Sequence, residues 1–407
     1  MSVRAHAPLT QFPVVDDALR VGGRTLDDLA REAGRTPFYA YDRAAIAARI
    51  AAVKALLPGG VDLHYAMKAN PMPALVAHVA PLVDGLDVAS VGELRVALAS
   101  GMDPAEISFA GPGKTDAELA AAADAGILVN VESFRELDVL ARHAGPRRAR
   151  VAVRVNPDFE LKSSGMKMGG GPKPFGIDAE EVPRALAAIG AAGLAFEGFH
   201  IFGGSQNLQP QAIREAMEQA YALALRLSAA APSPVRVLNL GGGFGIPYFP
   251  GDAPLDTAPV GAALASLAAR ARHDLPHAKL VIELGRYLVG EAGVYVCRVI
   301  DRKVSRGQVF LVTDGGLHQH LAASGNFGQV LRKNYPVVVA HRVHGGPREL
   351  SSVVGPLCTP LDLLADRMDL AVAAPGDLIA VLQSGAYGLT ASPTAFLSHP
   401  APAELLV

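Results

Sequence analysis

The sequence contains few cysteines, few charged residues and no long apolar run. Two cysteines among 407 residues, Cys297 and Cys358, cannot build a disulfide framework. No uninterrupted apolar stretch reaches eighteen residues, so we expect no transmembrane helix and no membrane partner. The first residues lack the basic start and apolar block of a secretory signal. We therefore expect a protein of the reducing cytoplasm.

The sequence also lacks an excess of charge of either sign, because its formal net charge is −2. Nucleic-acid-binding domains usually carry a basic patch, so we expect no nucleic-acid partner. Hydrophobic residues make up 50% of the chain, which allows a large buried core. A chain of this length is suited to one barrel-sized domain and a second module.

Eight segments rich in Val, Ile and aromatic residues predict strands, and most are separated by Ala- and Leu-rich helical patterns. In the helical segment KTDAELAAAADAG, Thr115 or Asp116 is suited to cap the helix, and Gly126 to end it. The expected strands are VDLHYAM from Val61, VDGLDVAS from Val83, EISFAGP from Glu106, ILVNVES from Ile127, ARVAVRVN from Ala149, AFEGFHI from Ala195, PVRVLNLGG from Pro234 and KLVIELGR from Lys279.

Eight strands alternating with helices predict an α/β fold, a closed parallel (β/α)8 barrel. An open doubly wound sheet is the competing architecture, but KANPMP after the first strand is no dinucleotide-binding glycine turn. We place the barrel at residues 41–288 and a discontinuous β-rich domain at residues 1–40 and 289–407. The segment TPFYAYD should join the sheet formed by VYVCRVIDRKV, GQVFLVTDGG, YPVVVAHRV and DLIAVLQSGAYG. The Gly- and Pro-rich segment 164–174 indicates a mobile loop after the fifth strand.

Polar and glycine residues gather at the C-terminal ends of the expected strands, where barrel enzymes build their active sites. These ends carry Lys68, Glu283 and Arg286, and glycine turns at residues 203–205 and 241–243. Backbone N–H groups of such turns bind phosphate, and a lysine forms a Schiff base with an aldehyde. Together they suggest pyridoxal 5'-phosphate. His200 is the one histidine at these ends and stands without an acidic or histidine cluster, so we expect no metal.

Six motifs follow one another in the order of a known enzyme family: YAMKAN (65–70), DVASVGEL (87–94), GGGFG (241–245), ELGR (283–286), GPLCTPLD (355–362) and SGAYG (384–388). In these motifs, which span nearly the whole chain, the sequence resembles the fold-type III pyridoxal-phosphate decarboxylases, the diaminopimelate/ornithine decarboxylase family. The resemblance implies an alanine-racemase-like TIM barrel with a C-terminal β domain. It also implies a lyase of amino-acid metabolism that works as a homodimer with a shared active site.

The resemblance also implies roles for single residues. Lys68 and Cys358 would be catalytic: Lys68 carries the cofactor, and Cys358 reaches into the partner's site and returns a proton after loss of carbon dioxide. Glu283 would pair with the pyridine nitrogen. Arg286, Asp314 and Thr359 are the candidate substrate contacts. The cofactor-binding set would be Lys68, Asp87, His200, Phe202, Ser205, Gly242, Gly243, Glu283, Gly285, Arg286 and Tyr387.

The sequence departs from the family at positions that bear on the substrate. Phe202 stands where the family has a histidine that stacks on the cofactor ring, and His200 lies two residues earlier. Thr359 replaces the acid that contacts a distal amine, so we expect poor use of diamino substrates. Leu284 replaces the usual proline. The segment 313–337 and the string HIFGGSQ are similar to a diaminopimelate-decarboxylase-like subgroup associated with exosortase systems, some of whose relatives act on a carrier-linked amino acid.

Several interpretations remain open on the sequence alone. The first hypothesis is a decarboxylase of a free or carrier-linked amino acid; the alternatives are a racemase of the same fold and a non-catalytic, cofactor-binding regulatory homologue. Asp314 is suited equally to contact substrate or to cap a turn. His200 is suited equally to the core or to a ligand. Cys297 lies in a strand pattern and should be a core residue.

Overall fold

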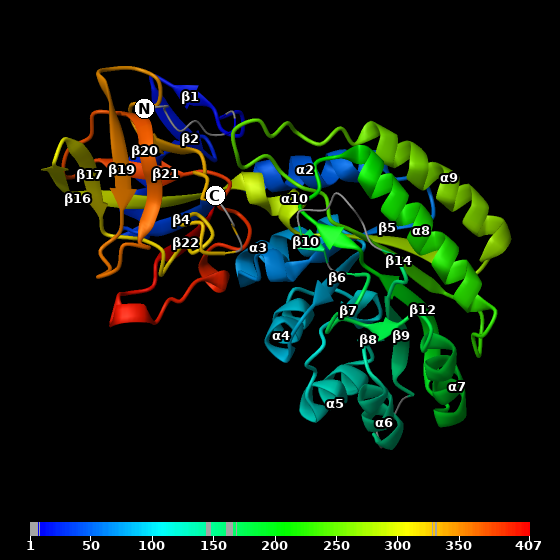
Figure 1. Cartoon of the computed structure of the whole chain (residues 1–407). Helices are drawn as coiled ribbons and strands as arrows, with labels where there is room; N and C mark the ends of the chain where they lie inside the picture. Colours follow the sequence, from blue (N-terminus) through cyan, green and yellow to red (C-terminus); the bar gives the residue numbers. More distant parts are fainter. Residues whose placement is uncertain are drawn as a thin grey trace. The chain divides into compact units, whose positions relative to one another are not determined.

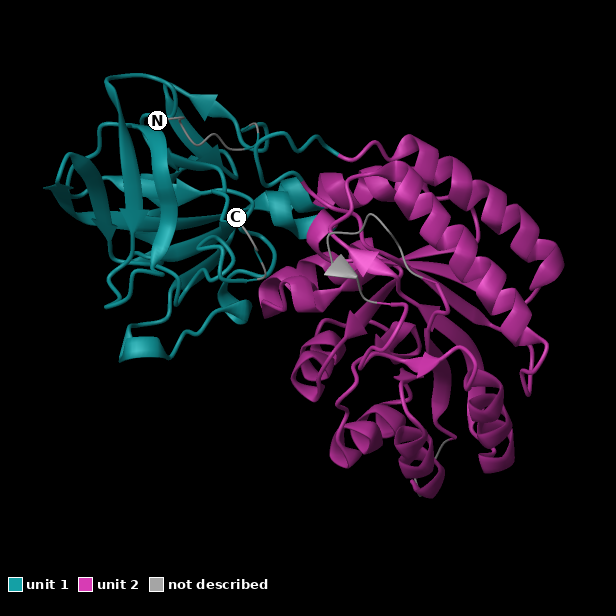
Figure 2. Ribbon diagram, in the orientation of Figure 1, with its two compact units in different colours: residues 1–46, 247–254, 288–407 teal, residues 47–246, 255–287 magenta. Residues whose placement is uncertain are grey.

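The computed structural model describes residues 7, 9–143, 148–159, 166–167, 169–327, 329 and 332–407. The chain divides into two compact units (Figure 2). Residues 47–246 and 255–287 form the barrel unit, drawn in magenta, and residues 1–46, 247–254 and 288–407 form the β unit, drawn in teal.

The barrel unit is a closed ring of eight parallel strands, which confirms the predicted fold and all eight predicted strands (Figure 1). The ring closes because β8 pairs with β9 and β15 pairs with β5. A short strand, β11 (Ile177–Asp178), pairs in parallel with the last two residues of β9, beyond the stretch of β9 that pairs with β8. In ring order the strands are β5 (Val61–Ala66), β6 (Gly85–Val88), β7 (Ile107–Phe109), β8 (Leu128–Val131), β9 (Arg150–Asn156), β12 (Ala195–Ile201), β14 (Val237–Gly242) and β15 (Lys279–Leu284).

One helix, α2, precedes the first barrel strand, and each of the barrel strands is followed in the chain by a helix (Figure 1). In α5 the hydroxyl of Thr115 accepts from the Glu118 N–H and the Glu118 side chain bonds back, so Thr115 caps the helix and Asp116 is its first residue. Gly126 ends α5 in the left-handed conformation, as predicted. The helices are α2 (Arg43–Leu56), α3 (Pro73–Val79), α4 (Val91–Ala99), α5 (Asp116–Ala125), α6 (Phe134–Arg142), α7 (Val182–Ala192), α8 (Pro210–Ser228), α9 (Ala258–Asp274) and α10 (Arg286–Val289).

The β unit contains a sheet in the order β18-β21-β16-β17-β19-β20. As expected, the N-terminal segment TPFYAYD supplies a strand, β4 (Phe38–Tyr41), which pairs with β16 and with the C-terminal β22 (Ala403–Leu406). The long β16 (Gly293–Ser305) pairs with β17 (Gln308–Thr313) and β21 (Leu378–Val381). The sequence did not predict β19 (Arg348–Val354), β20 (Leu363–Ala371) or β22; β18 spans Val337–Val339.

Residues 14–33 form a small meander and a helix: β1 (Val14–Val15), β2 (Ala18–Val21), β3 (Arg24–Thr25) and α1 (Leu26–Ala33). Leu19, Val21 and Leu29 of this region are buried in one apolar cluster with strand residues of the β unit, including Phe38 and Val296. Burial of this apolar area stabilises the β unit as a separate core. Within the described part of the chain, none of the helices has the length and apolarity needed to cross a bilayer.

The expected loop at residues 164–174 lies partly outside the described residues, which leave out 160–165 and 168. Within it, β10 (Met166–Lys167) pairs with β13 (Gly204–Ser205), the short strand that follows β12.

Candidate active site

Lys68 lies on a 3₁₀ turn, Met67–Ala69, directly after β5. The Tyr65 hydroxyl donates to the Asn70 carbonyl at 2.9 Å and holds the turn closed. A Cβ on Gly285 would lie 2.8 Å from the Ala66 carbonyl oxygen, so only glycine lets β15 approach the turn. The motif YAMKAN therefore fixes the backbone that presents the lysine.

Lys68 lines a cavity of about 180 Å³ at the C-terminal end of the barrel. The cavity walls combine charged and aromatic side chains with the backbone of two loops. They are formed by Ala66, Lys68, Asp87, Val88, Ala89, Ala110, Gly111, Pro112, Arg154, Phe175, His200 and Glu283. Four of the predicted cofactor residues, Lys68, Asp87, His200 and Glu283, therefore meet in one cavity.

Glu283 is a buried carboxylate in this cavity, only 7% exposed. Its Oε2 lies 3.1 Å from the His200 Nε2 and accepts from the Asn239 Nδ2 at 3.2 Å. Burial raises the pKa of Glu283, but the charges of His200, Lys68 and Arg154 outweigh burial and hold the pKa well below its usual range. Glu283 is therefore ionised at neutral pH, as a partner of a protonated ring nitrogen must be. The sequence left open whether His200 is a core residue or faces a ligand. Both descriptions hold, because His200 is buried and is also part of the cavity wall.

Two glycine turns meet beside Lys68. Gly241 and Gly243 adopt left-handed backbone conformations at the end of β14. A Cβ on Gly243 would lie 2.1 Å from the Gly204 carbonyl oxygen, and one on Gly241 would lie 2.9 Å from a ring atom of Phe202. The Phe202 ring centroid lies 5.7 Å from the Lys68 Nζ. The two glycine turns that the sequence assigned to phosphate binding and the Phe202 ring are thus close together, and added side chains would fill the space between the turns.

A buried network around Glu132 holds further walls of the cavity. Glu132 Oε1 accepts from the Gly111 N–H at 2.6 Å and the Arg154 Nη1 at 3.0 Å, and Oε2 accepts from the Gly176 N–H at 3.0 Å. The Glu132 carboxylate therefore holds in place the loops at Gly111 and Gly176 and the guanidinium of Arg154.

A second pair, buried like Glu132, supports that carboxylate. Glu136 accepts from the Glu132 N–H at 2.8 Å and pairs with the Lys114 Nζ at 3.0 Å. Burial lowers the pKa of Lys114 and raises that of Glu136, and each charge partly offsets the burial of the other.

The sequence-based prediction missed several residues of the barrel cavity, two of which have large side chains. Arg154 and Phe175 line the cavity, and the Arg154 guanidinium lies over the Phe175 ring at 5.3 Å. Burial raises the pKa of Glu93 in the same unit, while the hydrogen bond from the Ala89 N–H and the charge of Lys68 oppose that rise. The position of Arg154 near the end of β9 was a usable signal, whereas Phe175 lies outside the expected strands and carried no pattern.

The other predicted site residues belong to the β unit. Cys358 is exposed in the loop between β19 and β20, and Thr359 follows it. Asp362 holds this loop by accepting from the Leu357 N–H at 2.9 Å. Gly355 is required there, because its Cβ would lie 2.3 Å from an Asp362 carboxylate oxygen.

Two more predicted residues of the β unit are engaged within that unit. Asp314 accepts from the Arg298 N–H of β16 at 2.7 Å and from the Thr36 hydroxyl, so its carboxylate connects β16 with the N-terminal segment. Tyr387 stacks against Phe327 with ring centroids 6.4 Å apart. Cys297 is fully buried, as predicted for a core cysteine.

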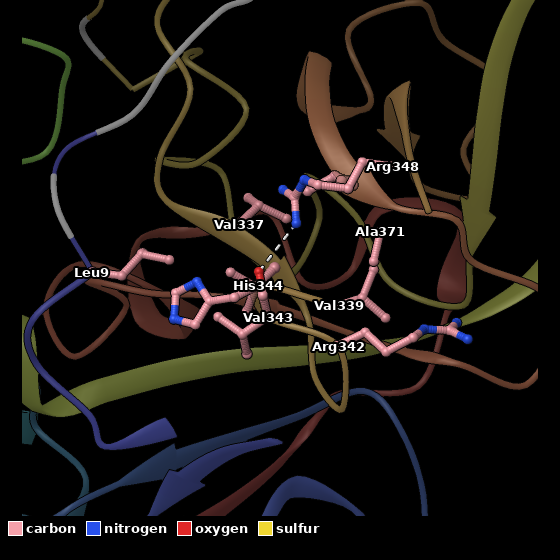
Figure 3. Close-up of a pocket in the computed structure, with 10 residues that line it drawn as sticks. Leu9, Val337, Val339, Arg342, Val343, His344, Arg348 and Ala371 are labelled. Atoms are coloured by element: carbon pink, nitrogen blue, oxygen red, sulfur yellow. Dashed lines mark hydrogen bonds between the residues drawn. The ribbon is translucent and has the colours of Figure 1, made fainter. Parts of the chain in front are cut away.

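A larger cavity, about 360 Å³, lies in the β unit but offers less chemistry (Figure 3). Valines form much of its wall, and Arg348 points toward the Val343 carbonyl, to which it donates at 3.2 Å. Arg348 also pairs with Asp369, and Arg342 pairs with Asp377. Both cations are thus neutralised by carboxylates, so we place the active site in the barrel.

A barrel that presents a lysine, an ionised buried carboxylate and two glycine turns beside one cavity defines a class of enzyme: one that binds a phosphorylated aldehyde cofactor through its lysine. Within the described residues, no group of three or more His, Cys, Asp or Glu side chains is placed to hold a metal.

Comparison with known proteins identifies the family. The model for "Pyridoxal-dependent decarboxylase, pyridoxal binding domain" matches residues 43–290. The chain is 38% identical over 379 residues to the L-glutamyl-[BtrI acyl-carrier protein] decarboxylase of Niallia circulans, covering 91% of this chain and 88% of that protein. It is 34% identical over 400 residues to the diaminopimelate decarboxylase of Aquifex aeolicus, covering 96% and 91%.

The fold agrees with a solved relative. The structure of diaminopimelate decarboxylase from Helicobacter pylori, complexed with L-lysine, aligns with a TM-score of 0.82 at 27% identity, covering 94% of each chain. The chain belongs to the pyridoxal-dependent decarboxylases. It is a carboxy-lyase that acts on an amino acid, with pyridoxal phosphate as cofactor.

Proposed function

We propose that this decarboxylase acts on an amino acid whose side chain is joined to a carrier protein. The observation that carries the proposal is Thr359, next to Cys358, where the resemblance led us to expect an acid for a distal amine. A neutral residue there suits a side chain that ends in an acyl linkage rather than in a cation. The 38% identical relative supports the proposal, since its name places glutamate on an acyl-carrier protein.

We infer roles for the residues of the barrel cavity. Lys68 holds the cofactor through its amine, and Glu283 keeps a proton on the ring nitrogen. Phe202 packs against the ring, and the glycine turns, with Gly243, offer N–H groups to the phosphate. When bound, pyridoxal phosphate supplies an electron sink for the carbanion left by loss of carbon dioxide.

We further propose that Cys358 returns a proton to the substrate carbon in the site of a second protomer. Its exposure on the chain is compatible with such a role, and a thiol is one of the side chains that act as general acids. The enzyme would then be an obligate homodimer. We also propose that it works in the cytoplasm, and that its cofactor domain spans residues 41–288 and its β domain residues 1–40 and 289–407.

A substrate comparison tests the proposal. Carbon dioxide release is measured with glutamate as a thioester on a purified carrier protein, with free glutamate, and with meso-diaminopimelate. We expect the thioester to be the best substrate by at least about tenfold in kcat/KM, a difference of roughly 1.4 kcal/mol in transition-state binding. Efficient turnover of meso-diaminopimelate would contradict the role given to Thr359.

A matched variant makes the comparison sharper. Thr359→Asp restores an acid at the position and should raise the relative rate with meso-diaminopimelate, because a carboxylate can pair with the distal ammonium. Thr359→Ser keeps the hydroxyl and should leave the preference unchanged. If both variants retain the wild-type preference, Thr359 does not select the substrate.

A further inference from the structure

Four polar side chains form a buried chain across the barrel, one from each of the strands β5 to β8. His64 Nδ1 lies 3.1 Å from Asp87 Oδ1, Ser108 Oγ donates to the same oxygen at 2.7 Å, and Asn130 Nδ2 donates to Ser108 Oγ at 3.1 Å. All four residues are at most 7% exposed. Branched apolar residues usually fill such a barrel, so a polar chain here needs a reason.

The chain fixes one oxygen of Asp87 and leaves the other available. Both His64 and Ser108 contact Oδ1, and the Asn130 amide directs the Ser108 hydrogen toward that oxygen. Oδ2 is buried and has no hydrogen-bond partner among the residues that the structure describes. Asp87 itself lines the cavity that holds Lys68. A buried carboxylate oxygen left without a partner is costly, which indicates that it meets a ligand group there.

The ring of His64 fits beside β6 only because position 85 is a glycine. A Cβ on Gly85 would lie 2.5 Å from His64 Nε2 and 2.5 Å from the Glu106 carbonyl oxygen, so only glycine is compatible with the ring. The His64 ring therefore packs directly against the backbone of β6, the strand that also carries Asp87.

The charges around His64 favour its protonated form. Burial lowers the pKa of the imidazole, but Asp87, with smaller contributions from Asp62 and Glu106, outweighs burial and leaves the pKa above 6.5. Lys279 pairs with Asp62 at 2.9 Å and Glu106 at 3.3 Å and so offsets part of their charge.

We propose that His64 is a positioning residue, which holds Asp87 with its free oxygen turned toward the cationic nitrogen of the lysine-bound cofactor. The proposal rests on the function proposed above, because it assumes that the cavity at Lys68 binds pyridoxal phosphate. His64 acts through Asp87 and touches neither substrate nor cofactor.

The test compares two variants that place a side-chain N–H at different positions of the former ring. His64→Asn puts its amide nitrogen near the place of Nδ1, which contacts Asp87, whereas His64→Gln puts it near Nε2. The apparent Kd of pyridoxal phosphate is measured by titrating the apoprotein and following the visible absorbance band. We expect the Kd of pyridoxal phosphate to rise about tenfold in His64→Gln, because this variant loses the buried hydrogen bond to Asp87. The Kd of His64→Asn, which keeps that hydrogen bond, should stay within about threefold of wild type.

A control and a second variant keep the result interpretable. His320 is fully buried in the β unit, with Nε2 2.8 Å from the Ser384 hydroxyl, so His320→Gln should leave the Kd unchanged. Ser108→Ala removes the other donor to the same Asp87 oxygen and should weaken binding as His64→Gln does. This variant carries the test if circular dichroism shows that His64→Gln is unfolded.

A second readout needs no cofactor. In the histidine-labelled apoprotein, the NMR signal of His64, assigned by its loss in His64→Gln, should titrate above 6.5 and move downward in Asp87→Asn. A signal unaffected by Asp87→Asn would overturn the proposal. A visible band in wild type with the same Kd in His64→Gln, His64→Asn and Ser108→Ala would overturn this proposal alone, whereas no band in wild type would overturn the proposed cofactor site as well.

Discussion

The carboxylate of Glu132 should carry a large share of the stability of the active-site walls. It accepts hydrogen bonds from Gly111, Gly176 and Arg154 at 2.6, 3.0 and 3.0 Å. Glu132→Gln keeps one oxygen and places an amide NH₂ against at least one of these donors. One unsatisfied buried donor costs about 1–3 kcal/mol, and the arginine bond also loses its charge assistance. We therefore expect a loss of about 2–4 kcal/mol in the free energy of unfolding.

An exposed ion pair of the barrel unit provides the control. Glu218 and Arg270 lie 2.7 Å apart, but their side chains are 43% and 44% exposed. Glu218→Gln should therefore cost less than about 1 kcal/mol.

Urea unfolding of the apoprotein, followed by circular dichroism because the chain has no tryptophan, compares the two variants with wild type. Equal shifts of the two midpoints would refute the reasoning from burial. In the holoenzyme, Glu132→Gln should also lower activity, since Gly111 and Arg154 line the cavity.

Other predictions follow from single sites. Gly85→Ala brings a methyl group within 2.5 Å of a ring and a carbonyl and should lower the melting temperature, whereas Gly59→Ala meets open space and should not. Because the pKa of Glu283 is lowered in the fold, its stabilising contribution is present above about pH 4.5 and decreases as the pH falls. The difference in urea midpoint between wild type and Glu283→Gln should then be smaller at pH 3 than at pH 7; an equal difference would contradict the lowered pKa. Thiol reagents should label exposed Cys358 and not buried Cys297 in the native protein. Labelling that persists in Cys358→Ser would mean that Cys297 is accessible, which contradicts its burial.

The sequence predicted the barrel well because its signal is local. Each of the eight predicted strands is a short segment rich in Val, Ile and aromatic residues, and the capping residues of α5 lie directly beside its helical pattern. The strands β19, β20 and β22 were not predicted, because their pattern is weaker: β22 has intermediate burial throughout, and β19 and β20 mix polar and apolar residues.

Site residues that stand at the ends of predicted strands could be predicted from the sequence. Contacts between residues far apart in the chain could not. Lys68, Asp87, His200 and Glu283 stand at strand ends, and the closed ring brings such ends together. The hydrogen bonds of Glu132 connect residues 21 to 44 positions apart, so no spacing in the sequence indicated them. The pairing of His64 with Asp87 was hidden for the same reason, because it depends on the register of two strands.

The most direct test of the central assignment is an absorbance spectrum of the purified protein beside Lys68→Ala, each with added pyridoxal phosphate. The account predicts a visible band in the wild-type protein that sodium borohydride removes and that is absent from the variant, because the lysine amine is the attachment point. An unchanged spectrum on adding the cofactor to the wild-type protein, or the same band in Lys68→Ala, would contradict the assignment.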